Sequence, residues 1–362
     1  MAVDAARIEG NTVLLGGARV RFIRTLRLPE TGTHPLPPGL GEFPVRRVED
    51  HPDTVPPEWR AKGGVMLPVY LREAMWLSFA GTDEPSALQV GVGKVCAVSG
   101  ERWTGALSRR PQNYLTLPRQ PWLDGINSGR GTVRQFVAVP LGMGATVEGQ
   151  VTGEETVGGV QLQAFGLGEA AHQVWRAERE RARLLRPRVE TARYGAPPGA
   201  FPEPGAAGGG APPPAPGGSP GARTTRGAAA PRARSAVMGL GAGGSMRQQV
   251  FEDDRPLSDW AAEPSARTFV HLVTAPEWRR ITGEAAPPSP VDRAAYTAAG
   301  LPWFDHYDES ATDLAPPRAL GDVRPVGDWI GDDHTPWQAP GASQVRPLGD
   351  PRPGRPVRDG DW

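Results

Sequence analysis

The chain has 362 residues, and its 40 basic and 40 acidic residues cancel to a net charge of zero with a pI near 7.0. This length allows two or three domains, and the absence of net charge gives no reason to expect a nucleic-acid or anionic-membrane partner. The single cysteine, Cys96, excludes an intramolecular disulfide and a cysteine-based zinc cluster. The first residues lack the features of a signal peptide, and no run of about 18 apolar residues predicts a membrane helix. We therefore expect a cytoplasmic protein with no membrane and no nucleic-acid partner.

The N-terminal part of the chain reads as a series of short strands. Residues 12–15 and 18–28 alternate around a Gly-Gly pair that suits a two-residue hairpin turn. Further strands are predicted over residues 74–79, 88–99 and 132–139, and the Pro-Glu-Trp-Arg segment that begins at Pro57 predicts a short helix. Such a series predicts a mainly β protein with an antiparallel β-sandwich or jelly-roll-like core and a few short helices.

The stretch from residue 111 to 165 contains the clearest alternation of apolar and polar residues. Residues 145–152 and 160–164 follow a period of two, which predicts two strands that each have one buried and one solvated face. Because a short, glycine-bounded linker joins them, we expect a hairpin whose polar faces merge into one binding surface. That surface would carry Glu148, Gln150, Gln161 and Gln163. Trp122 lies in a turn-rich segment and would either fix its loop to the core or stack on a ligand.

The composition divides the chain into five segments. A charged helix follows the first β-rich domain, and a Pro/Gly/Ala-rich segment is too poor in apolar residues to offset the entropy lost on ordering. A second ordered α+β segment, expected to pack on the first domain, precedes a disordered tail. The segments are residues 10–168 (β-rich domain), 169–194 (helix), 195–236 (disordered linker), 237–328 (second ordered segment) and 329–362 (tail).

Two groups of acidic residues are candidates for chemistry. Glu148 and Glu154 could form a carboxylate pair for glycosidase-type acid and base catalysis, although glutamates in a turn are usually only solvated. Asp305, Asp308 and Glu309 could bind a hard cation such as Ca²⁺ or Mg²⁺, or could simply form a solvated acidic turn. Neither group is complete enough to define a site.

Two other sequence features have weaker functional interpretations. Residues 239–244 match the letters of the dinucleotide motif G-x-G-x-x-G, but no strand–turn–helix context surrounds them, so we expect a glycine-rich entry to a strand and no cofactor. His271 alternates with apolar residues, which favours a histidine of the core.

Five segments together resemble a family of bacterial proteins, many from actinomycetes, to which no reaction is assigned. They are PWLDG (121–125), RQFVAVPLG (134–142), VTGEE (151–155), ITGE (281–284) and GLPWFDHYDE (300–309). The resemblance covers roughly residues 10 to 167 and 237 to 325, and it implies that both ordered segments belong to one architecture. It carries no catalytic residue to this chain.

The leading hypothesis is therefore a non-enzymatic binding module that uses the polar sheet face to bind an unknown protein or small molecule. Two alternatives remain open at this point. One is a hydrolase, glycan-directed or metal-assisted, that uses paired carboxylates. The other is a structural subunit of an assembly.

Overall fold

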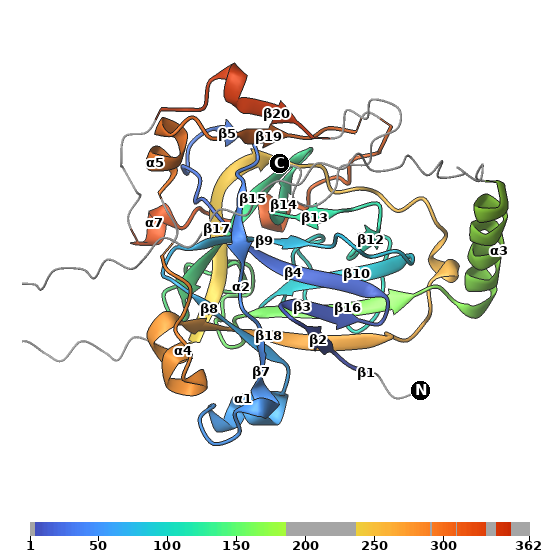
Figure 1. The fold of residues 1–362 in the computed structure, drawn as a ribbon, viewed down its shortest axis with the longest axis horizontal. Helices are drawn as coiled ribbons and strands as arrows, with labels where there is room; N and C mark the ends of the chain where they lie inside the picture. Colours follow the sequence, from blue (N-terminus) through green and yellow to red (C-terminus); the bar gives the residue numbers. More distant parts are fainter. Residues whose placement is uncertain (1–3, 186–236, 290–291, 309, 331–337, 349–362) are drawn as a thin grey trace, which may run out of the picture. The chain divides into compact units, whose positions relative to one another are not determined.

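The computed structural model describes residues 4–185, 237–289, 292–308, 310–330 and 338–348. The predicted linker, Glu309 and most of the predicted tail lie outside the described residues. The chain divides into two compact units, one of residues 1–174 with 234–362 and the other of residues 175–233. The first unit contains every strand of the described residues, and its fold is mainly β, as the sequence predicts (Figure 1).

One group of strands, the first ladder, is arranged around β16 and β18. Strand β16 pairs antiparallel with β10 on one side and with β18 on the other. Strand β18 in turn pairs parallel with β8. The first ladder comprises β1 (Asp4–Ala5), β7 (Arg46–Arg47), β8 (Val65–Val69), β10 (Ser86–Val92), β11 (Val95–Cys96), β12 (Leu115–Leu117), β16 (Val160–Gly166) and β18 (Ala266–Thr274).

A second group, the second ladder, is arranged around β4, β9 and β15. The strand β9 pairs antiparallel with β4 and β15, and β15 pairs along almost its whole length with β17. The second ladder comprises β2 (Arg7–Glu9), β3 (Thr12–Leu15), β4 (Ala18–Thr25), β5 (Thr33–His34), β6 (Gly39–Glu42), β9 (Ala74–Ser78), β13 (Trp122–Leu123), β14 (Gly125–Gly129), β15 (Thr132–Pro140) and β17 (Val237–Arg247).

The two ladders share one hydrophobic core. They are joined by the pairing of β17 with β18, in which Val237 lies opposite Val273 and Met238 lies opposite Leu272. Phe22 of β4, Val90 of β10 and Leu162 of β16 belong to the same cluster of buried side chains, each 1% exposed or less. Burying such a side chain contributes about 1.5–3 kcal/mol relative to leaving it in water, so this shared core is the main stabilising element of the unit.

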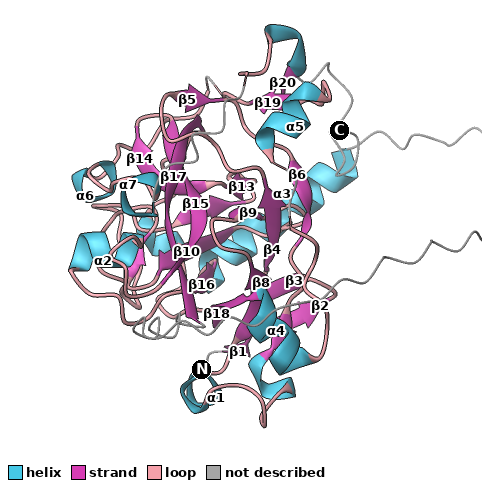
Figure 2. Cartoon of the chain, turned by 90° about the vertical axis from the view of Figure 1, so that its left-hand side faces the viewer, coloured by secondary structure: helices cyan, strands magenta, loops and turns pink. Residues whose placement is uncertain are grey.

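Apart from α3, which runs from the first unit into the second, the helices are short and lie at the ends and margins of the strands. They are α1 (Pro57–Lys62), α2 (Val147–Thr152), α3 (Glu169–Leu185), α4 (Ala275–Thr282), α5 (Arg293–Ala298), α6 (Arg318–Gly321) and α7 (Gly327–Ile330), with 3-10 turns η1 (Val48–Asp50), η2 (Leu257–Asp259) and η3 (Ala342–Gln344). Trp59 of α1 and Trp278 of α4 meet in a second cluster above β8 and β18. Figure 2 shows α2, α6 and α7 together at another margin, and the small sheet of β19 (Trp303–Asp305) and β20 (Val345–Pro347) at a third.

Several local predictions are confirmed. The hairpin expected over residues 12–28 is β3 and β4, with Val13 opposite Val20 and a positive φ of 56° at Gly16. The helix expected at Pro57 is α1, and the strands expected over residues 74–79, 132–139 and 160–164 are β9, β15 and β16. Burial does not follow a strict alternation, however: β9 is buried at four of its five positions and β15 at every position from Gln135 to Val139, so both faces of these strands are covered.

Residues 145–152 do not form the predicted strand, so the predicted hairpin with residues 160–164 is wrong. They contain the helix α2, whose first turn is capped by Thr146: its hydroxyl accepts a hydrogen bond from the N–H of Gly149 at 2.9 Å. Gly153 ends the helix with a φ of 76°. Six residues are too few to separate the two periods, since Val147 and Val151 also share a helical face.

The glycine-rich stretch 239–244 is not an entry to a strand either. It lies inside β17, where it pairs with β15 opposite residues that include Phe136 and Val139. A Cβ at Gly244 would lie 2.0 Å from the carbonyl oxygen of Pro29, so the absence of side chains here lets other segments approach the strand closely. A phosphate-binding loop between strand and helix is therefore excluded at this position.

Candidate functional site

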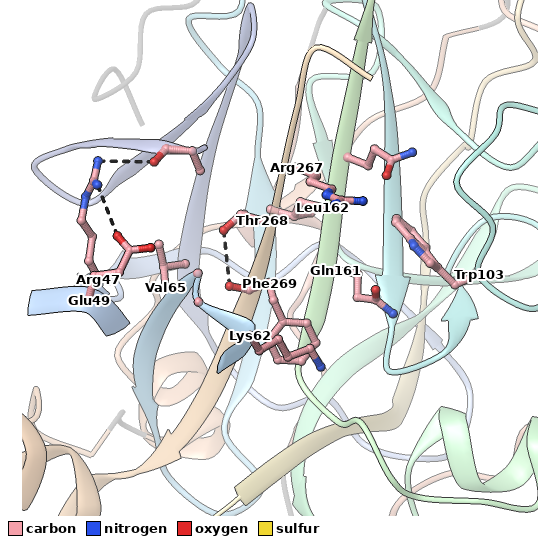
Figure 3. Close-up of a pocket in the computed structure, with 14 residues that line it drawn as sticks. Arg47, Glu49, Lys62, Val65, Trp103, Gln161, Leu162, Arg267, Thr268 and Phe269 are labelled. Atoms are coloured by element: carbon pink, nitrogen blue, oxygen red, sulfur yellow. Dashed lines mark hydrogen bonds and ion pairs between the residues drawn. The ribbon is translucent and has the colours of Figure 1, made fainter. Parts of the chain in front are cut away.

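A pocket of about 370 Å³, which we call the Lys62 pocket, opens on one face of the first ladder (Figure 3). Its lining includes Arg47, Lys62, Trp103, Gln161, Arg267 and Phe269. In the register of β16 and β18, Gln161 lies opposite Phe269 and Gln163 opposite Arg267. Residues two apart on a strand share a face, so these four side chains form two neighbouring cross-strand pairs in the pocket.

Two amide side chains are held in fixed positions on this face. The Nε2 of Gln161 donates to the carbonyl oxygen of Gly93 at 2.6 Å. The Nε2 of Gln163 donates to the Oε1 of Gln89 at 3.2 Å and to the carbonyl oxygen of Gly105 at 3.0 Å. Because Gln163 is only 3% exposed, these bonds satisfy a group that would otherwise be buried without partners.

Trp103 closes one side of the pocket. It lies in the loop after β11, where its backbone N–H donates to the carbonyl oxygen of Lys94 at 2.7 Å. The indole lies against Gly91 of β10, and a Cβ at that position would be 2.5 Å from the ring. Glycine at position 91 is therefore required for the half-buried indole to lie this close to the strand.

Lys62 reaches the pocket from the end of α1. Gly63 and Gly64 follow it with φ values of 67° and 96°, and a Cβ at Gly64 would collide with the carbonyl oxygen of Phe269 at 2.2 Å. This close approach of two backbones places the Nζ of Lys62 at 3.4 Å from the centroid of the Phe269 ring. Burial lowers the pKa of Lys62, and the charge of Glu148 offsets part of that effect. The aromatic face also favours the charged amine.

The pocket contains more positive than negative charge. Arg47 lies 3.6 Å from Glu49 and donates to the carbonyl oxygen of Ala6 at 3.3 Å, so its charge is already balanced. Lys62 and Arg267 form no ion pair with any carboxylate of the described residues. Figure 3 shows Arg47 and Glu49 on one side, Trp103 on the other, and β18 with Arg267 and Phe269 between them. The lining therefore combines two cations that have no ion-pair partner with the indole of Trp103, a combination that suits an anionic ligand.

The structure places only two of the four predicted surface residues in this pocket. Gln161 and Gln163 share a face, as predicted, and line it. Glu148 and Gln150 do not belong to that face because they lie on α2, and the Nε2 of Gln150 bonds to the carbonyl oxygen of Arg324 at 3.1 Å. The prediction of one polar sheet face with all four residues is therefore wrong. The polar face that the structure shows is formed by β16 and β18, and of the four residues it carries only Gln161 and Gln163.

The carboxylate pair proposed for a hydrolase is not formed as predicted. Glu148 is 1% exposed, and its carboxylate accepts backbone N–H groups of Val157 at 3.2 Å and Gly158 at 2.8 Å. Glu154 lies at the surface, where it forms an ion pair with Lys94 at 3.0 Å. The carboxylate of Glu148 holds a buried loop, whereas that of Glu154 is solvated. The two groups therefore do not face a common site in which they could act on one substrate.

The predicted cation cluster is not assembled among the described residues. Asp305 faces Arg247 at 3.5 Å, and Asp308 accepts hydrogen bonds from Ser310, while Glu309 lies outside the described residues. Within the described part of the chain, no group of three or more histidine, cysteine or acidic side chains is placed to bind a metal ion.

The core position expected for His271 is confirmed. His271 is 3% exposed, stacks on Trp59 with ring centroids 4.4 Å apart, and bonds through Nε2 to the carbonyl oxygen of Gly63 at 3.0 Å. Burial lowers the pKa of His271 to about 4. The imidazole is therefore neutral at physiological pH and supports the Gly63 turn behind Lys62.

Sequence reasoning missed Lys62, Trp103 and Arg267. One signal was available, because the alternation in residues 266–274 places Arg267 and Phe269 on one strand face. A fully buried face would not tolerate the charge of Arg267, so this face had to be partly open. Lys62 gave a second signal, because it and Lys94 are the only lysines among 40 basic residues. Their convergence depends on the pairing of β16 with β18, which periodicity does not reveal.

Comparison of the chain with models of protein families, with curated proteins and with solved structures found no match. The resemblance to an actinomycete family therefore stays a prediction. In the described residues, no helix combines the length and the apolar composition that crossing a bilayer requires.

Proposed function

We propose that the protein is a binding module whose ligand is a small organic anion with a planar ring, held in the Lys62 pocket. The observation that carries the proposal is the presence of two cations without carboxylate partners, Lys62 and Arg267, beside the aromatic rings of Trp103 and Phe269. This is a refined form of the binding module expected from the sequence, with a different set of residues.

The chemistry of the pocket favours a carboxylate or phosphate group on the ligand. An ammonium and a guanidinium group can each donate charge-assisted hydrogen bonds to one anionic group, which are about twice as strong as neutral ones. The same anion would stabilise the protonated Lys62, whose pKa burial lowers in the empty pocket. Binding should therefore be accompanied by proton uptake when the pH lies near that pKa.

The rest of the pocket favours a flat, compact ligand. Trp103 is half-buried and offers an apolar face, and the volume of about 370 Å³ lies within the range of small-molecule sites, roughly 300–1,000 Å³. The amides of Gln161 and Gln163 line the wall of the pocket and are held by other bonds, so the wall is formed before the ligand enters. A preformed site loses less entropy on binding.

The alternatives from the sequence have less support. The hydrolase hypothesis depended on Glu148, which is occupied by backbone N–H groups inside the protein. The assembly hypothesis predicts a stable oligomer, which native mass spectrometry would detect.

Isothermal titration calorimetry with phenyl phosphate tests the proposal. Phenyl phosphate should bind the wild-type protein, and it should bind more tightly than inorganic phosphate because only the former contacts the aromatic rings. Lys62→Gln and Arg267→Gln should each weaken binding about tenfold, as expected for the loss of one charge-assisted hydrogen bond. The matched control is Lys94→Gln, since Lys94 is the other lysine and pairs with Glu154 outside the pocket.

Two results would contradict the proposal. One is the absence of measurable binding of phenyl phosphate at millimolar concentration. The other is an equal loss of affinity in Lys94→Gln, which would indicate nonspecific attraction to positive charge and no defined site.

A further inference from the structure

A second pocket, of about 440 Å³, lies on the second ladder, where β9 pairs with β4 and β13. We call it the Trp76 pocket; its lining includes Pro37, Pro38, Trp76, Trp122, Phe304 and Leu348. Trp122 of β13 lies opposite Ser78, two positions along β9 from Trp76, so both indoles are on one face of the ladder. Both tryptophans are half-buried, so part of each side chain stays accessible.

The remaining walls of the pocket come from segments far apart in the sequence. Leu36 and Phe304 exchange backbone hydrogen bonds of 2.8 and 3.0 Å, which joins the loop before β6 to β19. Phe304 also lies opposite Arg346 in the parallel pairing of β19 with β20. Figures 1 and 2 show β19, β20 and α5 together. Strand β20 therefore brings the last described part of the chain to the pocket.

Leu348, the last residue that the structure describes, lies at the pocket itself. It is half-buried and belongs to the lining. Its N–H donates to the carbonyl oxygen of Asp305 at 2.5 Å, and its carbonyl oxygen accepts from Nδ1 of His306 at 2.7 Å. The imidazole of His306 meets the indole of Trp122 edge-on, with ring centroids 5.1 Å apart. The chain that follows, residues 349–362, therefore starts at the edge of the pocket.

The sequence of residues 349–362 has the composition of a segment that binds aromatic grooves. Pro353 and Pro356 are three residues apart, and Arg352, Arg355 and Arg358 recur with the same spacing. A polyproline II helix has three residues per turn and no internal hydrogen bonds. In that conformation the two prolines share one edge and the three arginines share another.

The charges of this segment and of the pocket are compatible. In residues 349–362 the three arginines are balanced by Asp350, Asp359 and Asp361. At the pocket, Arg21 and Glu42 form an ion pair at 3.0 Å, and Asp124 is only 3% exposed. Because neither side carries an excess of one sign, apolar contact between prolines and indoles is the interaction that the pocket offers.

From these observations we propose that residues 349–358 fold back into the Trp76 pocket as a polyproline II segment, with Pro353 and Pro356 against Trp76 and Trp122. Proline-rich segments bind aromatic grooves because their extended conformation is favoured before binding, so little entropy is lost. The covalent connection helps as well, since a short tether gives an effective concentration in the millimolar range. The proposal does not depend on the Lys62 pocket, which opens on the other ladder.

Fluorine NMR of the full chain labelled with 5-fluorotryptophan tests the proposal, and Trp76→Phe and Trp122→Phe assign the two signals of the pocket. The test variant combines Pro353→Ser with Pro356→Ser, which leaves the charge unchanged. It should shift both signals, because the segment leaves the pocket. The matched control combines Pro213→Ser with Pro216→Ser, a proline pair with the same spacing in the Pro/Gly/Ala-rich segment. The control should leave both signals at their wild-type positions.

A free peptide with the sequence of residues 349–358 gives a second readout. Added to the variant with Pro353→Ser and Pro356→Ser, it should return the signals of Trp76 and Trp122 toward their wild-type positions. Binding to the wild-type protein should be about tenfold weaker, because the attached segment competes at a millimolar effective concentration. The same peptide with serine in place of both prolines should have no effect.

Two results would overturn the proposal. One is a pair of pocket signals that does not move in the variant with Pro353→Ser and Pro356→Ser; if they move with Pro213→Ser and Pro216→Ser instead, that other segment is the occupant. The second is equal binding of the peptide to wild type and variant, which would assign the pocket to a proline-rich segment of a partner. Neither result uses phenyl phosphate, so the two sites are tested separately.

Discussion

Asp124 should make the stability of the fold fall as the pH rises. Its carboxylate is 3% exposed, and Gln248 both accepts from the backbone N–H of Asp124 at 2.9 Å and donates to the carboxylate at 2.6 Å. Burial raises the pKa of Asp124 from 3.8 to about 7, and the hydrogen bonds from Trp122 and Gln248 oppose this only in part. The folded protein therefore keeps a proton on Asp124 that the unfolded chain has already lost at mildly acidic pH.

The size of the effect follows from that difference in pKa. A raised pKa in the folded state gives stability that is complete below about pH 4 and is lost as the pH rises to about 7. Each unit of difference corresponds to 1.36 kcal/mol, so the shift from 3.8 to about 7 amounts to about 4 kcal/mol in total. Between pH 5 and pH 8 the loss should be about 3 kcal/mol, and above about pH 8 the contribution should be negligible.

Urea unfolding of the wild type and of Asp124→Asn at about pH 5 and about pH 8 measures the contribution of Asp124 to the free energy of unfolding. Asparagine is uncharged at both values, so the free energy of unfolding of the variant minus that of the wild type should rise by about 3 kcal/mol between them. Asp83→Asn, at an exposed position, is the control for a general effect of removing a carboxylate. A difference that stays constant within roughly 0.5 kcal/mol would refute the reasoning, because the buried carboxyl would then titrate as it does in the unfolded chain.

Three further predictions concern the surroundings of the Lys62 pocket. Glu148→Ala should lower the free energy of unfolding by about 1–3 kcal/mol in urea titrations, because two buried backbone N–H groups lose their acceptor. Gly91→Ala should displace the indole of Trp103, which would increase its exposure to fluorescence quenchers and weaken phenyl phosphate binding. Phe269→Leu should lower the pKa of Lys62 further in NMR titrations, since the aromatic face stabilises the ammonium ion.

The elements that could be predicted from the sequence have a long pattern or a strong local signal. The hairpin of β3 and β4 combines alternation with a Gly-Gly turn, and α1 begins with proline in its first turn. The strand predicted over residues 145–152 was wrong because the six residues that form α2 fit both periods, and the cap at Thr146 favours the helix. The strand β17 was missed over residues 237–245, since its glycines have low strand propensity and are required by the close approach of neighbouring segments.

The Lys62 pocket was less predictable, because it depends on strand pairing between distant segments. Gln161 and Gln163 could be assigned to one face, but Arg267 joins them only through the pairing of β16 with β18. Trp122 was recognised as an anchor or stacking residue, and in the structure it lines a second pocket together with Trp76 and Phe304. Trp76 itself gave no signal, because an apolar strand does not show which of its faces is covered and which is hollow.

The most direct test of the proposed function uses the two lysines of the chain. Protein labelled with ¹³C at lysine Cε should give two signals, from Lys62 and Lys94, and Lys94→Arg assigns them. The pKa of Lys62, lowered by burial in the empty protein, should rise on saturation with phenyl phosphate, while the Lys94 signal stays unchanged. A Lys62 titration that is identical with and without phenyl phosphate would contradict the assignment of this pocket as an anion site.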